Sequence, residues 1–96
     1  LNQALYESTE RGKKLAQAER AYKVANAKFI LEQRAIGTPA TLIKDLAMGD
    51  EVVSGLRLER DIASVYYENA REAINSYKLE ARLIEEQIAR EWSAAK

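Results

Sequence analysis

The side chains that could support catalysis or bind a metal ion are, in this chain, mainly carboxylates. The sequence contains no histidine and no cysteine, which excludes a Ser-His-Asp or Cys-His arrangement, a thiolate zinc site and a Glu-x-x-His di-iron site. Glu59, Glu80 and Glu91 fall near the apolar line of a predicted long helix. Their spacing does not bring three carboxylates to one level, as Mg²⁺ or Mn²⁺ would need. We therefore expect no catalytic residues, no metal ion and no cofactor.

A second candidate site, for nucleic acid, lies on the basic side of the first predicted helix. It consists of the basic residues Arg11, Lys13, Lys14, Arg20 and Lys23. The whole chain, however, balances fifteen basic against fifteen acidic residues, whereas domains that bind nucleic acid are usually basic overall. We interpret the basic side as a solvated face, and contact with DNA remains the alternative.

The two halves of the chain carry opposite net charges. Residues 1–48 contain eight basic and five acidic residues, a net charge of +3, and residues 49–96 contain seven and ten, a net charge of −3. Opposite charges are expected where two segments pack together, although each exposed ion pair contributes only roughly 0–1 kcal/mol. The distribution therefore predicts that the two halves lie side by side, within one chain or between two.

Three helices must position these groups. The chain is 47% hydrophobic and 31% charged, with one proline and four glycines, a composition typical of long helices. We predict a single helical-hairpin domain over 1–96, with helices over 2–35 and 50–93 and a short helical elbow over 39–48. The apolar residues expected to cover the end of the hairpin from the elbow are Leu42, Ile43, Leu46 and Ala47.

The breaks between the helices are marked by residues with known preferences for helix ends. Gly37 is expected to end the first helix in the left-handed conformation, which glycine adopts without steric penalty. Thr38 is expected to cap the elbow, with Pro39 as its first helical residue. Asp50 is expected to cap the long helix.

Both long helices carry a line of apolar or small residues at alternating spacings of three and four. In the second of them, Arg60 interrupts this line. Such a line is the seam of a helix that faces another helix. The seam residues are Leu15, Ala18, Tyr22, Ala25 and Phe29 in the first helix and Val53, Leu56, Ala63, Tyr67, Ala70, Ile74, Tyr77, Ala81, Ile84 and Ile88 in the long helix. Bulky residues alternate with small ones, so that the two seams can interdigitate. The sequence therefore predicts an all-α antiparallel helical hairpin of two long helices joined by the elbow.

The first helix is too short to cover the whole seam of the long helix. A second apolar line on the long helix consists of Val52, Leu58, Ile62, Val65, Tyr66, Ala73, Leu79 and Leu83. We therefore expect self-association into a homodimer, as a four-helix bundle or a coiled coil. The expected oligomer or partner contacts are Tyr66, Leu83, Ile84, Ile88 and Trp92.

Several short motifs distributed over most of the chain resemble those of a protein group. They are GTPATLI at 37–43, GDE at 49–51, ERD at 59–61, YENAREAIN at 67–75 and REW at 90–92. With these motifs the chain resembles small helical proteins encoded by phages and prophages of Gram-positive bacteria. The resemblance implies no catalytic residues and an accessory role in the bacterial cytoplasm during phage growth.

These observations favour a protein that acts by binding. No apolar run reaches the length of a transmembrane helix, and the lack of cysteine fits a cytoplasmic protein. We expect a non-enzymatic protein-protein interaction or structural accessory protein, homo-oligomeric and phage-related. Its expected partners are a second copy of itself and a further, unidentified protein, with no membrane contact. The alternative is an accessory factor of phage DNA replication or recombination that contacts DNA through the basic side of the first helix.

Overall fold

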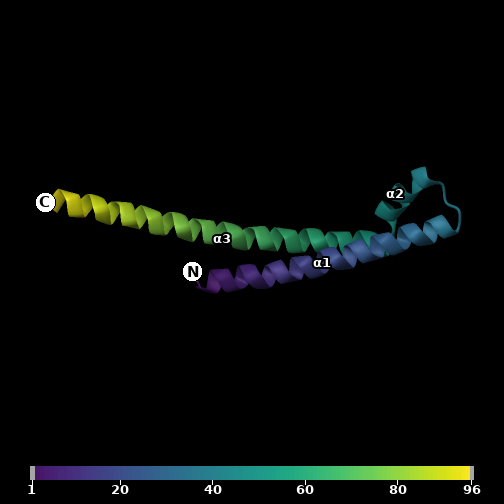
Figure 1. The fold of residues 1–96 in the computed structure, drawn as a ribbon, viewed down its shortest axis with the longest axis horizontal. Helices are drawn as coiled ribbons and strands as arrows, with labels where there is room; N and C mark the ends of the chain where they lie inside the picture. The colour runs from purple at the N-terminus through teal and green to yellow at the C-terminus, as the bar shows by residue number, and fades with distance from the viewer. Residues whose placement is uncertain (1, 96) are drawn as a thin grey trace.

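The computed structural model describes residues 2–95, which form three helices and no strand. α1 spans Asn2–Ala35, α2 spans Ala40–Gly49 and α3 spans Glu51–Ala95. α1 lies alongside the first part of α3, α2 lies at the closed end of the hairpin, and the last part of α3 projects beyond α1 (Figure 1). The predicted all-α helical hairpin is confirmed.

The end of α1 is a hydrogen-bonded glycine stop. Gly37 has a φ of 84°, in the left-handed region that favours glycine. Its N–H donates to the carbonyl of Arg34 (3.1 Å), and the N–H of Thr38 donates to the carbonyl of Gln33 (3.0 Å). This pair of bonds satisfies two of the carbonyls that a helix end leaves free. The predicted role of Gly37 is therefore confirmed.

The capping residue of α2 differs from the prediction. Pro39, with a φ of −55° and a ψ of 133°, occupies the position before the helix, and α2 begins at Ala40. The extended ψ keeps Pro39 out of the helix, so Pro39 is not its first residue. The hydroxyl of Thr38 donates to Oε1 of Gln33 (2.7 Å), so this side chain closes the turn after α1. The prediction that Thr38 caps α2 is wrong for this reason.

Asp50 precedes α3 and caps its first turn, as predicted. Its Oδ2 atom accepts a hydrogen bond from the N–H of Val53 at 3.0 Å, which satisfies one of the free N–H groups in the first turn. Glu51 adds a second negative charge there, where the helix dipole is favourable for anions. A strong helix start therefore follows α2 almost directly.

The contact between α1 and α3 follows the predicted seam as far as Ile74. In α3, Val53 and Ala70 are buried. The seam residues that are half-buried are Leu15, Ala18, Tyr22, Ala25 and Phe29 in α1 and Leu56, Ala63, Tyr67 and Ile74 in α3. The core is small, because Ile43 and Ala47 of α2 are the other buried apolar residues of the described chain.

Arg60 occupies a seam position of α3, and its guanidinium group lies over the ring of Tyr22. Its Cζ atom lies 4.6 Å from the centroid of the Tyr22 ring, a cation–π contact, and its Nη2 atom lies 2.8 Å from Oδ1 of Asp61. The hydrogen bond with Asp61 raises the pKa of Arg60, which stays charged at any physiological pH. An arginine can therefore occupy the seam because its charge is paired at the edge.

Two glycines within the helices predict unequal gains in stability. A methyl group at Gly55 meets no atom within 4 Å, whereas one at Gly12 comes 3.3 Å from Cε1 of Tyr67. We expect Gly55→Ala to raise the free energy of unfolding by roughly 0.5–1 kcal/mol, the usual gain inside a helix. Gly12→Ala should gain less, because the Tyr67 ring must move. Urea titrations followed by circular dichroism measure both, and a larger gain at Gly12 would show that the ring does not pack there.

The two halves of opposite net charge lie side by side, as predicted, because α1 packs against α3. The ion pairs found among residues 2–95 connect near neighbours on one helix, such as Arg11 with Glu7 (3.5 Å) and Arg71 with Glu68 (3.9 Å). A polar contact that does cross the hairpin is the bond from Nη1 of Arg11 to the carbonyl of Tyr66 (3.0 Å). Long side chains on exposed helices reach partners one turn away more easily than partners on another helix. The two halves therefore pack together with opposite net charges, but their charged side chains form ion pairs within each helix and, among the described residues, not between α1 and α3.

The molecule is far more extended than a compact monomer. It measures 81 × 24 × 15 Å and has a radius of gyration of 22.7 Å, whereas a compact chain of this length has one of about 12 Å. Its accessible surface is 7619 Å², and a folded monomer of this size exposes about 5,500 Å². Residues 75–94 contribute to this excess, because each of them is exposed.

Candidate functional site

The α3 tail, defined here as residues 75–94, is the largest feature of the molecule that lacks a packing partner. Every residue from 75 to 94 is exposed. α1 stops opposite its beginning, where Ala4 and Glu7 line one cleft together with Ala70, Ala73 and Tyr77. Beyond that cleft α3 continues alone (Figure 1). A helix with no packed face gains little stability beyond its own backbone hydrogen bonds, so the α3 tail is a candidate interaction surface.

The tail continues the seam that α1 covers, without a change of register. Tyr77, Ala81, Ile84 and Ile88 follow Ile74 at spacings of three, four, three and four. The side chains of Ile84 and Ile88 are 60% and 59% exposed, and Trp92 one turn later is 71% exposed. Large apolar side chains in a row at this exposure are typical of an interaction surface. We call these residues, Tyr77 to Trp92, the uncovered seam.

The predicted contact residues divide between two faces of α3. Ile84, Ile88 and Trp92 belong to the uncovered seam. Tyr66 lies about five turns before Ile84 and beside α1, whereas Leu83 lies about 100° around the helix from Ile84 and belongs to the second apolar line. That line is also exposed, with Leu58, Ile62, Val65, Leu79 and Leu83 between 46% and 60% accessible. The five residues predicted as contacts therefore do not form one site.

Tyr66 lies beside α1 in a cleft of mixed character. Its backbone carbonyl accepts the bond from Arg11, whose Cζ atom is 5.9 Å from the centroid of the Tyr66 ring. The cleft has a volume of about 460 Å³ and includes Ile62 and Glu59. Its apolar centre is surrounded by charges of both signs, so it offers no clear preference for one class of ligand.

The basic residues proposed for nucleic acid are partly engaged within the protein. Arg11 is bound to Tyr66 and Glu7, and Nζ of Lys13 lies 3.3 Å from Oε1 of Glu10. Lys14 lines the cleft beside Tyr66. Arg20 and Lys23 are exposed on α1. The acidic neighbours weaken the positive potential that contact with phosphate groups requires.

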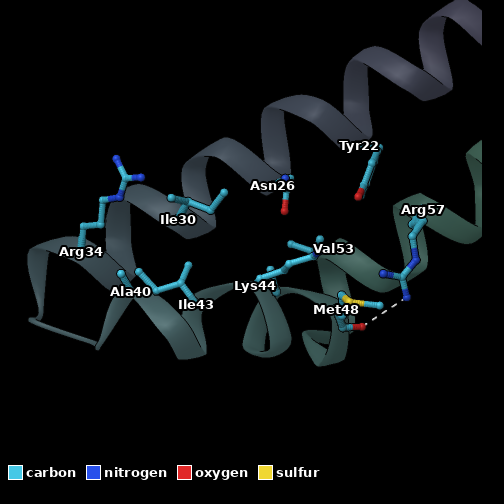
Figure 2. A pocket seen from close by; sticks show the side chains of 11 residues that line it. Tyr22, Asn26, Ile30, Arg34, Ala40, Ile43, Lys44, Met48, Val53 and Arg57 are labelled. Atoms are coloured by element: carbon cyan, nitrogen blue, oxygen red, sulfur yellow. Dashed lines mark hydrogen bonds between the residues drawn. The ribbon is translucent and has the colours of Figure 1, made fainter.

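A third feature, which sequence reasoning missed, is a cleft between α1, α2 and the start of α3. It has a volume of about 450 Å³, with Ile30, Ile43 and Val53 on its walls and the cations Arg34, Lys44 and Arg57 among its lining residues. Figure 2 shows Tyr22 and Asn26 pointing from α1 into this space. The apolar pattern of the elbow was the available signal, but it predicted a filled end.

The elbow covers the end of the hairpin less fully than predicted. Ile43 and Ala47 are buried, but Leu42 and Leu46 are exposed. A short helix turns only one face towards α1 and α3, and the apolar residues on its other sides remain in solvent. Arg57 further fixes the elbow, because its Nη2 atom donates to the carbonyl of Met48 at 3.3 Å (Figure 2). The cleft is what remains between the elbow and α1.

Neither metal binding nor membrane crossing finds support in the described residues. No three carboxylates among residues 2–95 are grouped so that they could hold a metal ion. Glu59 lines the cleft beside Tyr66, while Glu80 and Glu91 lie exposed on the α3 tail. No helix within the described part of the chain is long and apolar enough to span a bilayer.

Comparisons with protein-family models, with curated proteins and with solved structures give no match to this chain. The geometry of the hairpin is therefore the basis for an assignment of function.

Proposed function

We propose that this protein is a non-enzymatic, homo-oligomeric interaction protein that works through the uncovered seam of α3. The observation that carries the proposal is the continuity of the seam, which α1 covers up to Ile74 and leaves exposed from Tyr77 to Trp92. A heptad seam with apolar residues at its inward positions is a surface for another helix. The resemblance to small phage and prophage proteins supports an accessory role in the bacterial cytoplasm.

The excess surface of the hairpin supports self-association. The accessible area of 7619 Å² exceeds that of a compact monomer by about 2,000 Å². Stable homodimers bury about 2,000 Å² or more in total, counted over both partners. A dimer could therefore form on this surface and still leave apolar residues for a second protein.

Sedimentation equilibrium tests the proposal directly. We expect the protein to be a dimer at concentrations of tens of micromolar, because two exposed seams bury one another most simply in pairs. A stable monomer over the same concentration range would contradict the homo-oligomeric function.

Contact with DNA through the basic side of α1 is the alternative function, and a gel-shift titration separates it from the first. We expect no retardation of duplex or single-stranded DNA at micromolar protein and physiological salt, because Arg11 and Lys13 are paired with carboxylates. The control is the variant Arg20→Ala/Lys23→Ala, which removes two exposed cations of α1. A shift that weakens as salt is added and is lost in this variant would favour the DNA-binding function.

A further inference from the structure

We infer that the uncovered seam is covered by the same stretch of a second copy, which runs antiparallel and sets Ile84 of one copy against Ile88 of the other. This inference rests on the proposed function, because it names the partner and the geometry of the same surface. In this arrangement the two α3 tails contact each other, and the rest of each hairpin takes no part in the interface. The two hairpin bodies then point in opposite directions.

The occupant follows from the continuity of the uncovered seam with the interface between α1 and α3. In the covered part, α3 offers its seam to an antiparallel helix that is rich in alanine and aromatic residues. The tail offers the same seam in the same register and has the same character, with Tyr77 and Ala81 followed by Ile84 and Ile88. A second tail is therefore the same kind of partner as α1.

Heptad geometry limits the registers in which two tails can pair. The seam alternates between two sets of positions, one with Ala81 and Ile88 and the other with Tyr77 and Ile84. In an antiparallel coiled coil a residue of one set packs against a residue of the other set. Pairing Ile84 with Ile88 of the second copy satisfies this condition twice, because of the two-fold symmetry. It also brings Trp92 next to Lys78 of the second copy, where the ring and the ammonium group attract each other.

The position of α1 selects this register over its neighbours. With Ile84 opposite Ile88 of the second copy, position 94 of that copy lies opposite position 78, beside the cleft that Ala4, Glu7 and Tyr77 line. A shift of one heptad towards the hairpin would drive the partner's last turns into α1. A shift of one heptad in the other direction would set Ile88 opposite Glu91 of the second copy.

The second apolar line is a weaker candidate for the contact between copies. Its best antiparallel register pairs Leu58 with Leu83 and Ile62 with Leu79. Between these pairs the line passes through three consecutive polar positions, which are Asn69, Glu72 and Ser76. The uncovered seam contains one charged position, Glu91, which faces the small side chain of Ala81 of the second copy in this register.

Distances between spin labels on single cysteines test the register, since the protein contains no cysteine of its own. In Ser93→Cys the two labels should lie about 20 Å apart along the helix axis, and in Glu68→Cys about 55 Å apart, at 1.5 Å per residue. Pairing through the second apolar line reverses the order, with about 65 Å for Ser93→Cys and about 10 Å for Glu68→Cys. A parallel dimer gives short distances for both. Either of the last two results would overturn the inference.

A charge substitution gives a second, independent test. Glu85 of each copy lies next to the two-fold axis in this register, so the two carboxylates repel each other. We expect Glu85→Gln to tighten the dimer roughly twofold to fivefold, the range for one exposed charge pair. The control Glu86→Gln, which points away from the seam, should leave the dissociation constant unchanged. A dimer that Glu85→Gln does not tighten would contradict the register.

The homo-oligomeric function and the antiparallel pairing of the tails are contradicted by different results. A monomer in sedimentation equilibrium would overturn both the homo-oligomeric function and the inference. A stable dimer with reversed or uniformly short label distances would leave the proposed function intact and overturn only the antiparallel pairing of the tails.

Discussion

Ile84→Asp is expected to convert the proposed dimer into monomers. Burial of one isoleucine side chain stabilises an interface by roughly 1.5–3 kcal/mol, and each substitution enters the two-fold interface twice. The two aspartates also have no cation at the centre of the seam to pair with. The dissociation constant should therefore rise by roughly a hundredfold or more. Sedimentation equilibrium over a range of concentrations measures this change.

Ala89→Asp is the matched control for this substitution. Ala89 is exposed on the same tail, on the side of α3 that faces away from the uncovered seam. The variant Ala89→Asp introduces the same charge into the same helix as Ile84→Asp. Any general effect of aspartate on helix stability therefore appears in both variants. If Ala89→Asp dissociated the dimer as strongly as Ile84→Asp, the uncovered seam would not be the interface.

Val53→Asp is expected to disrupt the closed end of the hairpin. Val53 is 2% exposed and lies where α3 meets α1 and α2. A carboxylate there loses most of its water, and the apolar contacts of valine are lost as well. We expect a fall of about 3 kcal/mol or more in the free energy of unfolding. Urea titration followed by circular dichroism at 222 nm measures the change.

Val52→Asp provides a control at the neighbouring position, because Val52 is 65% exposed. The new carboxylate lies in the first turn of α3, where the helix dipole favours negative charge by about 0.3–1 kcal/mol. The stability of this variant should therefore stay close to that of the parent protein. If the two variants were equally unstable, Val53 would not be the buried anchor of the elbow.

The sequence was sufficient to predict the features of the fold that depend on local chemistry. Gly37 ends α1 because only glycine adopts a positive φ without penalty, and Asp50 caps the first turn of α3 because its carboxylate accepts a backbone N–H. The spacing of Tyr67, Ala70 and Ile74 on one face follows from the helical repeat alone. These features require no knowledge of the rest of the chain.

Features that depend on how three helices meet could not be predicted in the same way. The hydroxyl of Thr38 donates to Gln33 of α1, and Pro39 occupies the position before α2; the local sequence is compatible with Thr38 as the cap instead. The cleft beside α2 depends on the angle at which the elbow packs, which no residue spacing specifies. The division of Leu83 and Ile84 between two faces was available from helix geometry, but the prediction grouped them by position along the chain.

α3 runs without a break through the covered and uncovered parts of the seam, and it therefore sets the distance between the two hairpins of the proposed dimer. No proline or glycine follows Gly55 in this helix, so no residue with a strong tendency to kink it lies between the elbow and the tail. In the antiparallel pair, the first residues of the two α3 helices would stand about 100 Å apart, at 1.5 Å per residue. The dimer would then act as a molecular ruler that holds two identical elbow clefts at a fixed separation.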